Sequence, residues 1–90
     1  MAEPLSQQEA IQQFIDLANE MKNNGSSVQA VSSALLRACA LYSTYVVAGN
    51  DGALKESGVT KLKDLFGSEL ASIQSMKVRA FEASKQQQGL

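Results

Sequence analysis

The stretch VQAVSSALLRACALYSTYVV, residues 28–47, decides the fold of this chain. It has the length of a helix and carries apolar residues on nearly every side. A helix on the surface of a small domain shows one apolar stripe, whereas a helix that is apolar all round has to be covered on several sides. The stretch therefore predicts a central helix that is wrapped by its neighbours or by another copy of the chain.

Length and composition point to one small folded domain over residues 1–90. Hydrophobic residues make up 44% of the chain and charged residues 19%, which is a composition typical of folding rather than of disorder. Ninety residues are too few for two independent cores. A domain of this size leaves much of its chain exposed, so we expect modest net stability.

The residues before the central stretch predict a first helix at about residues 5–22. Ser6 and Glu9 have the Ser-x-x-Glu spacing of a capping box, which marks a helix N-terminus. Apolar residues then recur at helical spacing. The sequence Asn-Asn-Gly at residues 23–25 favours termination, because Asn and Gly tolerate the left-handed conformation found after a helix C-terminus.

The central helix is predicted at about residues 27–48. Ser26 or Ser27 is expected to cap it. Its last residues are β-branched or aromatic and also suit a strand, but no second alternating run is present to pair with them. The sequence Gly-Asn-Asp-Gly at residues 49–52 predicts a turn.

A third, amphipathic helix is predicted at about residues 59–85, after a break at Gly58. Gly67 inside it marks a kink, a close crossing of another helix or a break into two helices, and the sequence does not decide among these. Residues 86–90 are expected to fray. The fold class is therefore all-α, a three-helix bundle with a largely buried central helix.

The usual catalytic and metal-binding residues are scarce. The chain has no histidine, which removes the commonest general base and the commonest metal ligand. Its single cysteine, Cys39, lies inside the apolar stretch and is expected to be a buried structural thiol in a reducing compartment. No glycine-rich phosphate loop is present. We therefore predict no catalytic residues, no cofactor and no metal, and that the protein is not an enzyme.

Charge and hydropathy limit the partners. The formal net charge is −1, which does not suit a nucleic-acid backbone. Residues 28–47 have the length of a membrane span, but Arg37 lies at the centre, and an arginine at the bilayer midpoint costs about 2.5–3.5 kcal/mol on insertion scales. The N-terminus lacks the features of a secretory signal. We expect a cytoplasmic protein that binds neither nucleic acid nor membrane.

Five residues are candidates for an interaction or ligand surface. Arg37 is expected to lie at the rim of the core with the aliphatic part of its side chain packed. The alternatives are that it pairs with Asp16 or Glu20, or that it binds a ligand. Two tyrosines three residues apart share a face of the central helix, either in the core or at an interface, and two apolar residues lie on the face of the third helix. These four residues are Tyr42, Tyr45, Phe66 and Ile73.

Part of the chain resembles a known family. The segments are FIDLAN at residues 14–19, VSSALL at 31–36 and ACALY at 38–42. In these segments the chain resembles the small bacterial family catalogued as domain of unknown function 3144, and the similarity covers the first half of the chain, to about Ala48. The resemblance implies a bacterial, cytoplasmic, all-helical protein and brings no functional residues with it.

Three functions remain open on the sequence. The leading hypothesis is a non-enzymatic protein–protein interaction module that forms a homodimer through the third helix and part of residues 28–47. A second hypothesis is an adaptor or regulator that binds a different protein with its Tyr42 and Tyr45 side. The third is a small-ligand binder with a pocket between helices that is anchored by Arg37.

Overall fold

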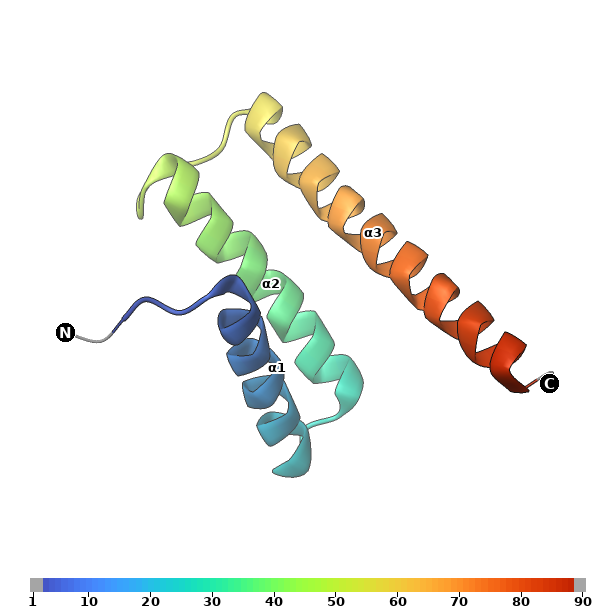
Figure 1. The fold of residues 1–90 in the computed structure, drawn as a ribbon. Helices are drawn as coiled ribbons and strands as arrows, with labels where there is room; N and C mark the ends of the chain where they lie inside the picture. The colour runs from blue at the N-terminus through green and yellow to red at the C-terminus, as the bar shows by residue number, and fades with distance from the viewer. Residues whose placement is uncertain (1–2, 89–90) are drawn as a thin grey trace. The chain divides into compact units, whose positions relative to one another are not determined.

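The computed structural model describes residues 3–88, and these residues form three α-helices (Figure 1). Helix α1 is Gln7–Asn23, α2 is Val28–Ala48 and α3 is Glu56–Gln88. Within the described part of the chain there is no strand. The prediction of an all-helical chain with three helices is confirmed, including the helical conformation of the β-branched end of α2.

Helix α1 begins at a complete capping box. The Ser6 side-chain oxygen accepts a hydrogen bond from the Glu9 N–H, and the Glu9 carboxylate accepts one from the Ser6 N–H, each at 3.1 Å. The hydrogen bonds from the backbone and then the side chain of Ser6 lower the pKa of Glu9 below its ordinary value of 4.5, since they favour the ionised carboxylate. The predicted start of the helix is therefore confirmed.

Helix α1 ends through its backbone at Gly25, which has a φ of +115°. The Gly25 N–H donates to the Lys22 carbonyl and the Ser26 N–H donates to the Met21 carbonyl, both at 3.1 Å. This pair of bonds is the Schellman motif, in which glycine takes the left-handed position without steric cost. The Asn-Asn-Gly sequence thus ends the helix as predicted.

Helix α2 starts immediately afterwards. The Ser27 side-chain oxygen accepts a hydrogen bond from the Ala30 N–H at 3.1 Å, so Ser27 is the cap rather than Ser26. The connection between the two helices is only four residues long, and α1 and α2 form a helical hairpin (Figure 1).

The expectation of a largely buried central helix is not met. No side chain in residues 3–85 is buried, and most residues of α2 are exposed. Cys39, which we expected to be a buried thiol, is also exposed. The physical reason is that the apolar residues of α2 surround the helix, and within its own unit only the short helix α1 is available to cover them.

A short irregular segment links α2 to α3. Gly49 has a φ of +82°, and its carbonyl accepts a hydrogen bond from the Gly52 N–H at 3.3 Å, which confirms the predicted turn. Helix α3 then begins at Glu56, three residues earlier than predicted. The expected break at Gly58 is absent, because the Gly58 N–H already donates to the Lys55 carbonyl at 2.9 Å in the first turn of α3.

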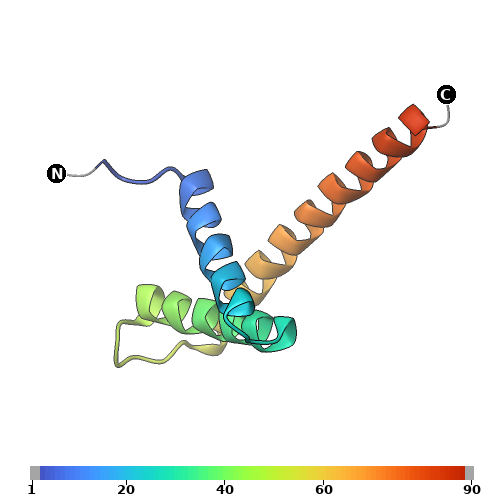
Figure 2. The same ribbon diagram turned by 90° about the horizontal axis from the view of Figure 1, so that it is seen from below.

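Helix α3 is uninterrupted over its 33 residues in Figures 1 and 2. It passes Gly67 without a break, which removes the option of two shorter helices. It also continues to Gln88 rather than ending near residue 85. The frayed tail was expected at residues 86–90; the first three of these are helical, and residues 89–90 lie outside the described residues.

The chain divides into two compact units, Met1–Val46 and Val47–Leu90. The first unit contains α1 and nearly all of α2. The second contains the connecting segment and α3. Each unit therefore has its own helical surface, and the single domain expected over residues 1–90 stays a prediction.

Candidate interaction surface

One side of α2 has the spacing of a helix-packing seam. Its six residues are separated alternately by four and three positions, which averages 3.6 residues, the period of an α-helix, and keeps them on one face along the whole helix. All six are exposed, and Tyr42 and Val46 reach 70% exposure. We call this face the α2 seam; its residues are Val28, Ser32, Leu35, Cys39, Tyr42 and Val46.

The two tyrosines singled out in the sequence lie at the C-terminal end of α2. Tyr42 belongs to the α2 seam, and Tyr45 lies on the adjacent column of the helix, three residues further on. Both side chains are exposed. A tyrosine offers a large apolar ring with a polar tip, which makes this end of α2 well suited to contact with a protein.

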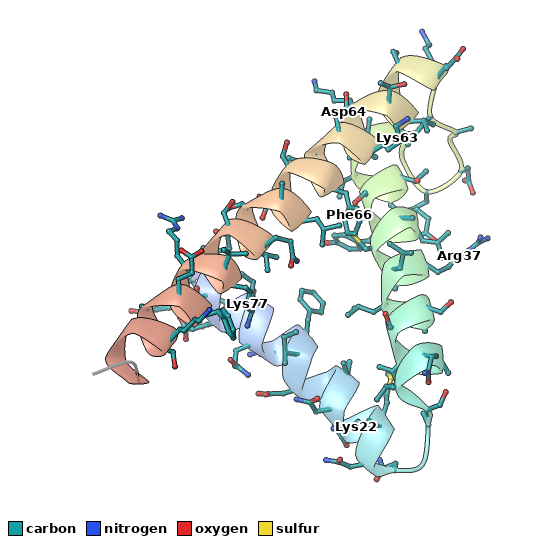
Figure 3. The ribbon with its side chains drawn as sticks, turned by 90° about the vertical axis from the view of Figure 1, so that its right-hand side faces the viewer. Lys22, Arg37, Lys63, Asp64, Phe66 and Lys77 are labelled. Carbon is teal, nitrogen blue, oxygen red and sulfur yellow. The ribbon has the colours of Figure 1, made fainter. Side chains whose placement is uncertain are left out.

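Arg37 is the only charged residue of α2 and lies on the side of the helix opposite to the α2 seam. In Figure 3 its side chain points outward, away from α1. One of its two expected partners, Asp16, instead accepts a hydrogen bond from the Gln12 side chain at 2.9 Å. The α2 seam itself is therefore free of charge.

The two apolar candidates of α3 share one face of that helix. Phe66 and Ile73 are seven residues apart, and both are exposed. Figure 3 marks Phe66 among the side chains of α3. Leu65 lies roughly a quarter-turn away or more from this face and is 58% exposed, against 51% for Phe66. Phe66 and Ile73 belong to the second unit, whereas the α2 seam belongs to the first.

A hollow that the sequence reasoning missed lies along α3. It is open to solvent and is lined by Gln74, Ser75, Val78 and Arg79. The Arg79 guanidinium donates to the Ser75 carbonyl of its own helix at 3.4 Å. All four residues come from one helix. None is among the five candidate residues chosen from the sequence, because the periodicity of the sequence does not distinguish them.

The described residues hold no group of three or more His, Cys, Asp or Glu side chains that could bind a metal ion. Among them, α2 is the one helix long and apolar enough to cross a membrane, judged by length and composition alone. The core helix of a soluble protein passes the same test, and none of α2 is buried here.

The fold and its surfaces define a small all-α protein whose apolar helix faces are open. The chain matches the family described as Protein of unknown function (DUF3144) over residues 7–64, more than half of its length, and it belongs to that family. The match includes α1, α2 and the first turns of α3, so it confirms the resemblance seen in the sequence and extends past Ala48. Neither the curated proteins nor the solved structures contain a match to this chain.

Proposed function

We propose that this protein is a non-enzymatic interaction module that acts as a homodimer, with α3 and part of α2 forming the contact. The observation that carries the proposal is that the apolar helix faces are not buried. No apolar side chain in residues 3–85 is buried, although the sequence has the hydrophobic content of a folded domain. A protein that folds stably has to cover such faces.

The distribution of apolar residues on α2 favours contact between chains. Apolar residues lie on several sides of α2, so a single neighbouring helix cannot cover them all. A second copy of the chain supplies a further neighbour without any additional protein, as in isologous dimers with the same patch on both subunits.

The chain's charges support a soluble dimer over a membrane span. A span through α2 would place Arg37 near the bilayer midpoint, at a cost of about 2.5–3.5 kcal/mol. The serine and threonine residues of α2 add further cost. With a net charge of −1, nucleic acid is a poor partner as well. We therefore propose a cytoplasmic location.

The absence of histidine in the sequence supports a role without catalysis, since general acid–base chemistry at neutral pH most often uses histidine. Large apolar side chains are exposed on the helices of both units. Such faces recognise other apolar faces. This is the property expected of an interaction module.

Two neighbouring substitutions on α3 test the proposal. Phe66→Asp places a charge on the proposed contact face, and Leu65→Asp places the same charge away from it at similar exposure. Light scattering on a sizing column is expected to give a folded monomer for Phe66→Asp and a dimer for Leu65→Asp, with equal helicity by circular dichroism.

Two other results would overturn the proposal. If Phe66→Asp unfolds, Phe66 belongs to the core of a single chain, and Ile73→Asp repeats the test at the next position on the same face. If the wild-type protein is a monomer, the exposed Tyr42 and Tyr45 side becomes the surface for a different protein. Flotation with neutral vesicles then shows whether a bilayer covers α2 instead.

A further inference from the structure

We propose that the turn between α1 and α2 is a site of covalent modification, at which the chain deamidates Asn24 whenever the turn opens. The turn joins the two helices of the first unit (Figure 1). Asn24 is exposed, and it is the only asparagine of the chain that is followed by glycine. The site is independent of the proposed homodimer.

The reaction uses the chain and water alone. The Gly25 backbone nitrogen loses its proton to hydroxide and attacks Cγ of Asn24. The new C–N bond closes a succinimide ring, and the side-chain nitrogen of Asn24 takes up a proton and leaves as ammonia. Water then opens the ring at either carbonyl, which gives aspartate or isoaspartate. Glycine favours this attack because it has no Cβ beside the nitrogen.

A hydrogen bond of the folded turn opposes the first step. The Gly25 N–H donates to the Lys22 carbonyl at 3.1 Å, within the Schellman motif that ends α1. The proton that has to be removed before the nitrogen can attack is therefore held by a backbone acceptor.

The backbone angle of Asn24 opposes ring closure as well. Its ψ of 6° makes the Gly25 nitrogen eclipse the backbone nitrogen of Asn24. Ring closure requires the Gly25 nitrogen to eclipse Cβ of Asn24 instead, and ψ is the soft dihedral that brings it there. This rotation moves Gly25 and Ser26 away from the carbonyls of Lys22 and Met21. The turn therefore has to open before Asn24 reacts.

The turn is placed to open without unfolding of the helices. All residues at positions 23–27 are exposed. Within the described chain, the space where a Cβ of Gly25 would lie has no other atom within 4 Å. Exposed helix ends with few packed neighbours open locally, at lower free energy than the whole fold. Local opening thus sets the rate of deamidation.

Deamidation prevents the turn from closing in its original form. Aspartate at position 24 puts a negative charge at the C-terminal end of α1, where the helix dipole is already negative, and Lys22 offsets part of it. Isoaspartate adds a methylene group to the main chain, which displaces Gly25 and Ser26 from their acceptors. The modification is therefore a one-way record of hairpin opening.

Mass spectrometry of the whole chain and its proteolytic peptides measures the reaction. Wild-type protein is kept in mildly alkaline buffer, either folded or unfolded in urea. We expect conversion at Asn24 under both conditions, at least about tenfold slower in the folded chain. Ammonia release is measured in parallel. The matched variant Asn24→Gln has the same amide on a longer side chain and is expected to lose almost no ammonia.

Two cap variants show whether local opening controls the rate. Ser27→Ala removes the α2 cap beside the turn, and Ser6→Ala removes the corresponding cap at the far end of α1. We expect Ser27→Ala to speed deamidation of the folded chain by up to about fivefold. Ser6→Ala is expected to leave the rate nearly unchanged.

Four results would overturn the proposal. Equal rates in folded and unfolded chains would show that the turn gives no protection. Equal acceleration by both cap variants would show that the reaction needs global unfolding. An unmodified Asn24 in urea would remove the site, as would isoaspartate formed at Asp51, before Gly52, without ammonia release. The mass of the assembly enters none of these results, so their failure leaves the proposed homodimer untouched.

Discussion

Helices α2 and α3 both carry apolar residues that need to be covered, but they distribute these residues differently. Helix α2 carries one charged residue in 21 positions, whereas α3 carries nine in 33. Charges of both signs confine the apolar residues of α3 mainly to one face, and a single neighbour can cover that face. Helix α2 is apolar on several sides and needs several neighbours. Helix α2, rather than the longer α3, therefore determines how many neighbouring helices the fold requires.

The helices also differ in how their ends are stabilised. Helices α1 and α2 have side-chain caps, at Ser6 and Ser27, and a glycine ends α1. Helix α3 begins at Glu56, where the Lys55 carbonyl accepts backbone hydrogen bonds from Gly58 and Val59. The hairpin is therefore defined by local chemistry, while α3 is defined by the continuity of its helical pattern.

The largest expected effect comes from a charge on the α2 seam. Val46→Asp is expected to weaken the dimer at least about 100-fold, because an unpaired carboxylate would be desolvated in each subunit. Val46 is 70% exposed within one chain, so helicity is expected to persist. Sedimentation or light scattering over a concentration series measures the change. Ser33→Asp, on another side of α2, is the control and is expected to leave the dimer unchanged.

The turn before α3 is expected to show the next largest effect. A methyl group at Gly52 would collide with the Ala48 carbonyl, so Gly52→Ala forces the backbone to move. We expect a loss of about 1–3 kcal/mol in the free energy of unfolding, measured by thermal or urea unfolding. Asp51→Ala changes the same turn without this collision. Equal stability of the two variants would contradict the turn geometry.

Removal of the α1 cap is expected to cost less. Ser6→Ala deletes the hydroxyl that accepts the Glu9 N–H and is expected to lower stability by about 1 kcal/mol. Urea unfolding followed by circular dichroism measures the loss. Ser33→Ala, inside α2, has no such role. A cost for Ser33→Ala equal to that for Ser6→Ala would argue against a capping contribution.

A gain is expected at Gly67, because glycine disfavours the interior of a helix such as α3. Gly67→Ala is expected to raise stability by up to about 1 kcal/mol, since a methyl group there meets nothing within 4 Å. Thermal unfolding measures the gain. A loss of stability, or a weaker dimer by light scattering, would show that another helix crosses close to Gly67.

The smallest expected effect is the pH dependence of the capping box. The pKa of Glu9 is lower in the folded chain than its ordinary value of 4.5, so its contribution to stability is fully present above that pH. The contribution is lost as the pH falls through the folded value. Unfolding curves of wild type and Glu9→Gln are therefore expected to differ at pH 7 and to converge in acid. A constant difference would show that ionised Glu9 plays no part.

Local chemistry made much of the fold predictable. Ser6, Ser27 and Gly25 act within a few residues of themselves, so their roles follow from the sequence. The start of α3 was less predictable, because Gly58 is compatible with a first helical turn in which Lys55 accepts its N–H. In both cases the contacts that determine where a helix begins or ends join residues close together in the sequence.

Whether α2 is buried was not predictable from local sequence. Its apolar residues correctly indicated a need for cover, but the sequence does not state which surface provides it. Cys39 illustrates this, since its apolar surroundings suggested burial and the chain leaves it exposed. The sequence thus shows that α2 is rich in apolar residues. Which of these residues form an interaction surface depends on the neighbours of α2.

The mass of the wild-type protein in solution tests the central claim most directly. Light scattering on a sizing column, repeated at several protein concentrations, measures it without any substitution. We predict about twice the 9.6-kDa mass of one chain, persisting on dilution. A single-chain mass at every concentration would contradict the account, because the open faces of α2 would then be covered without a second copy.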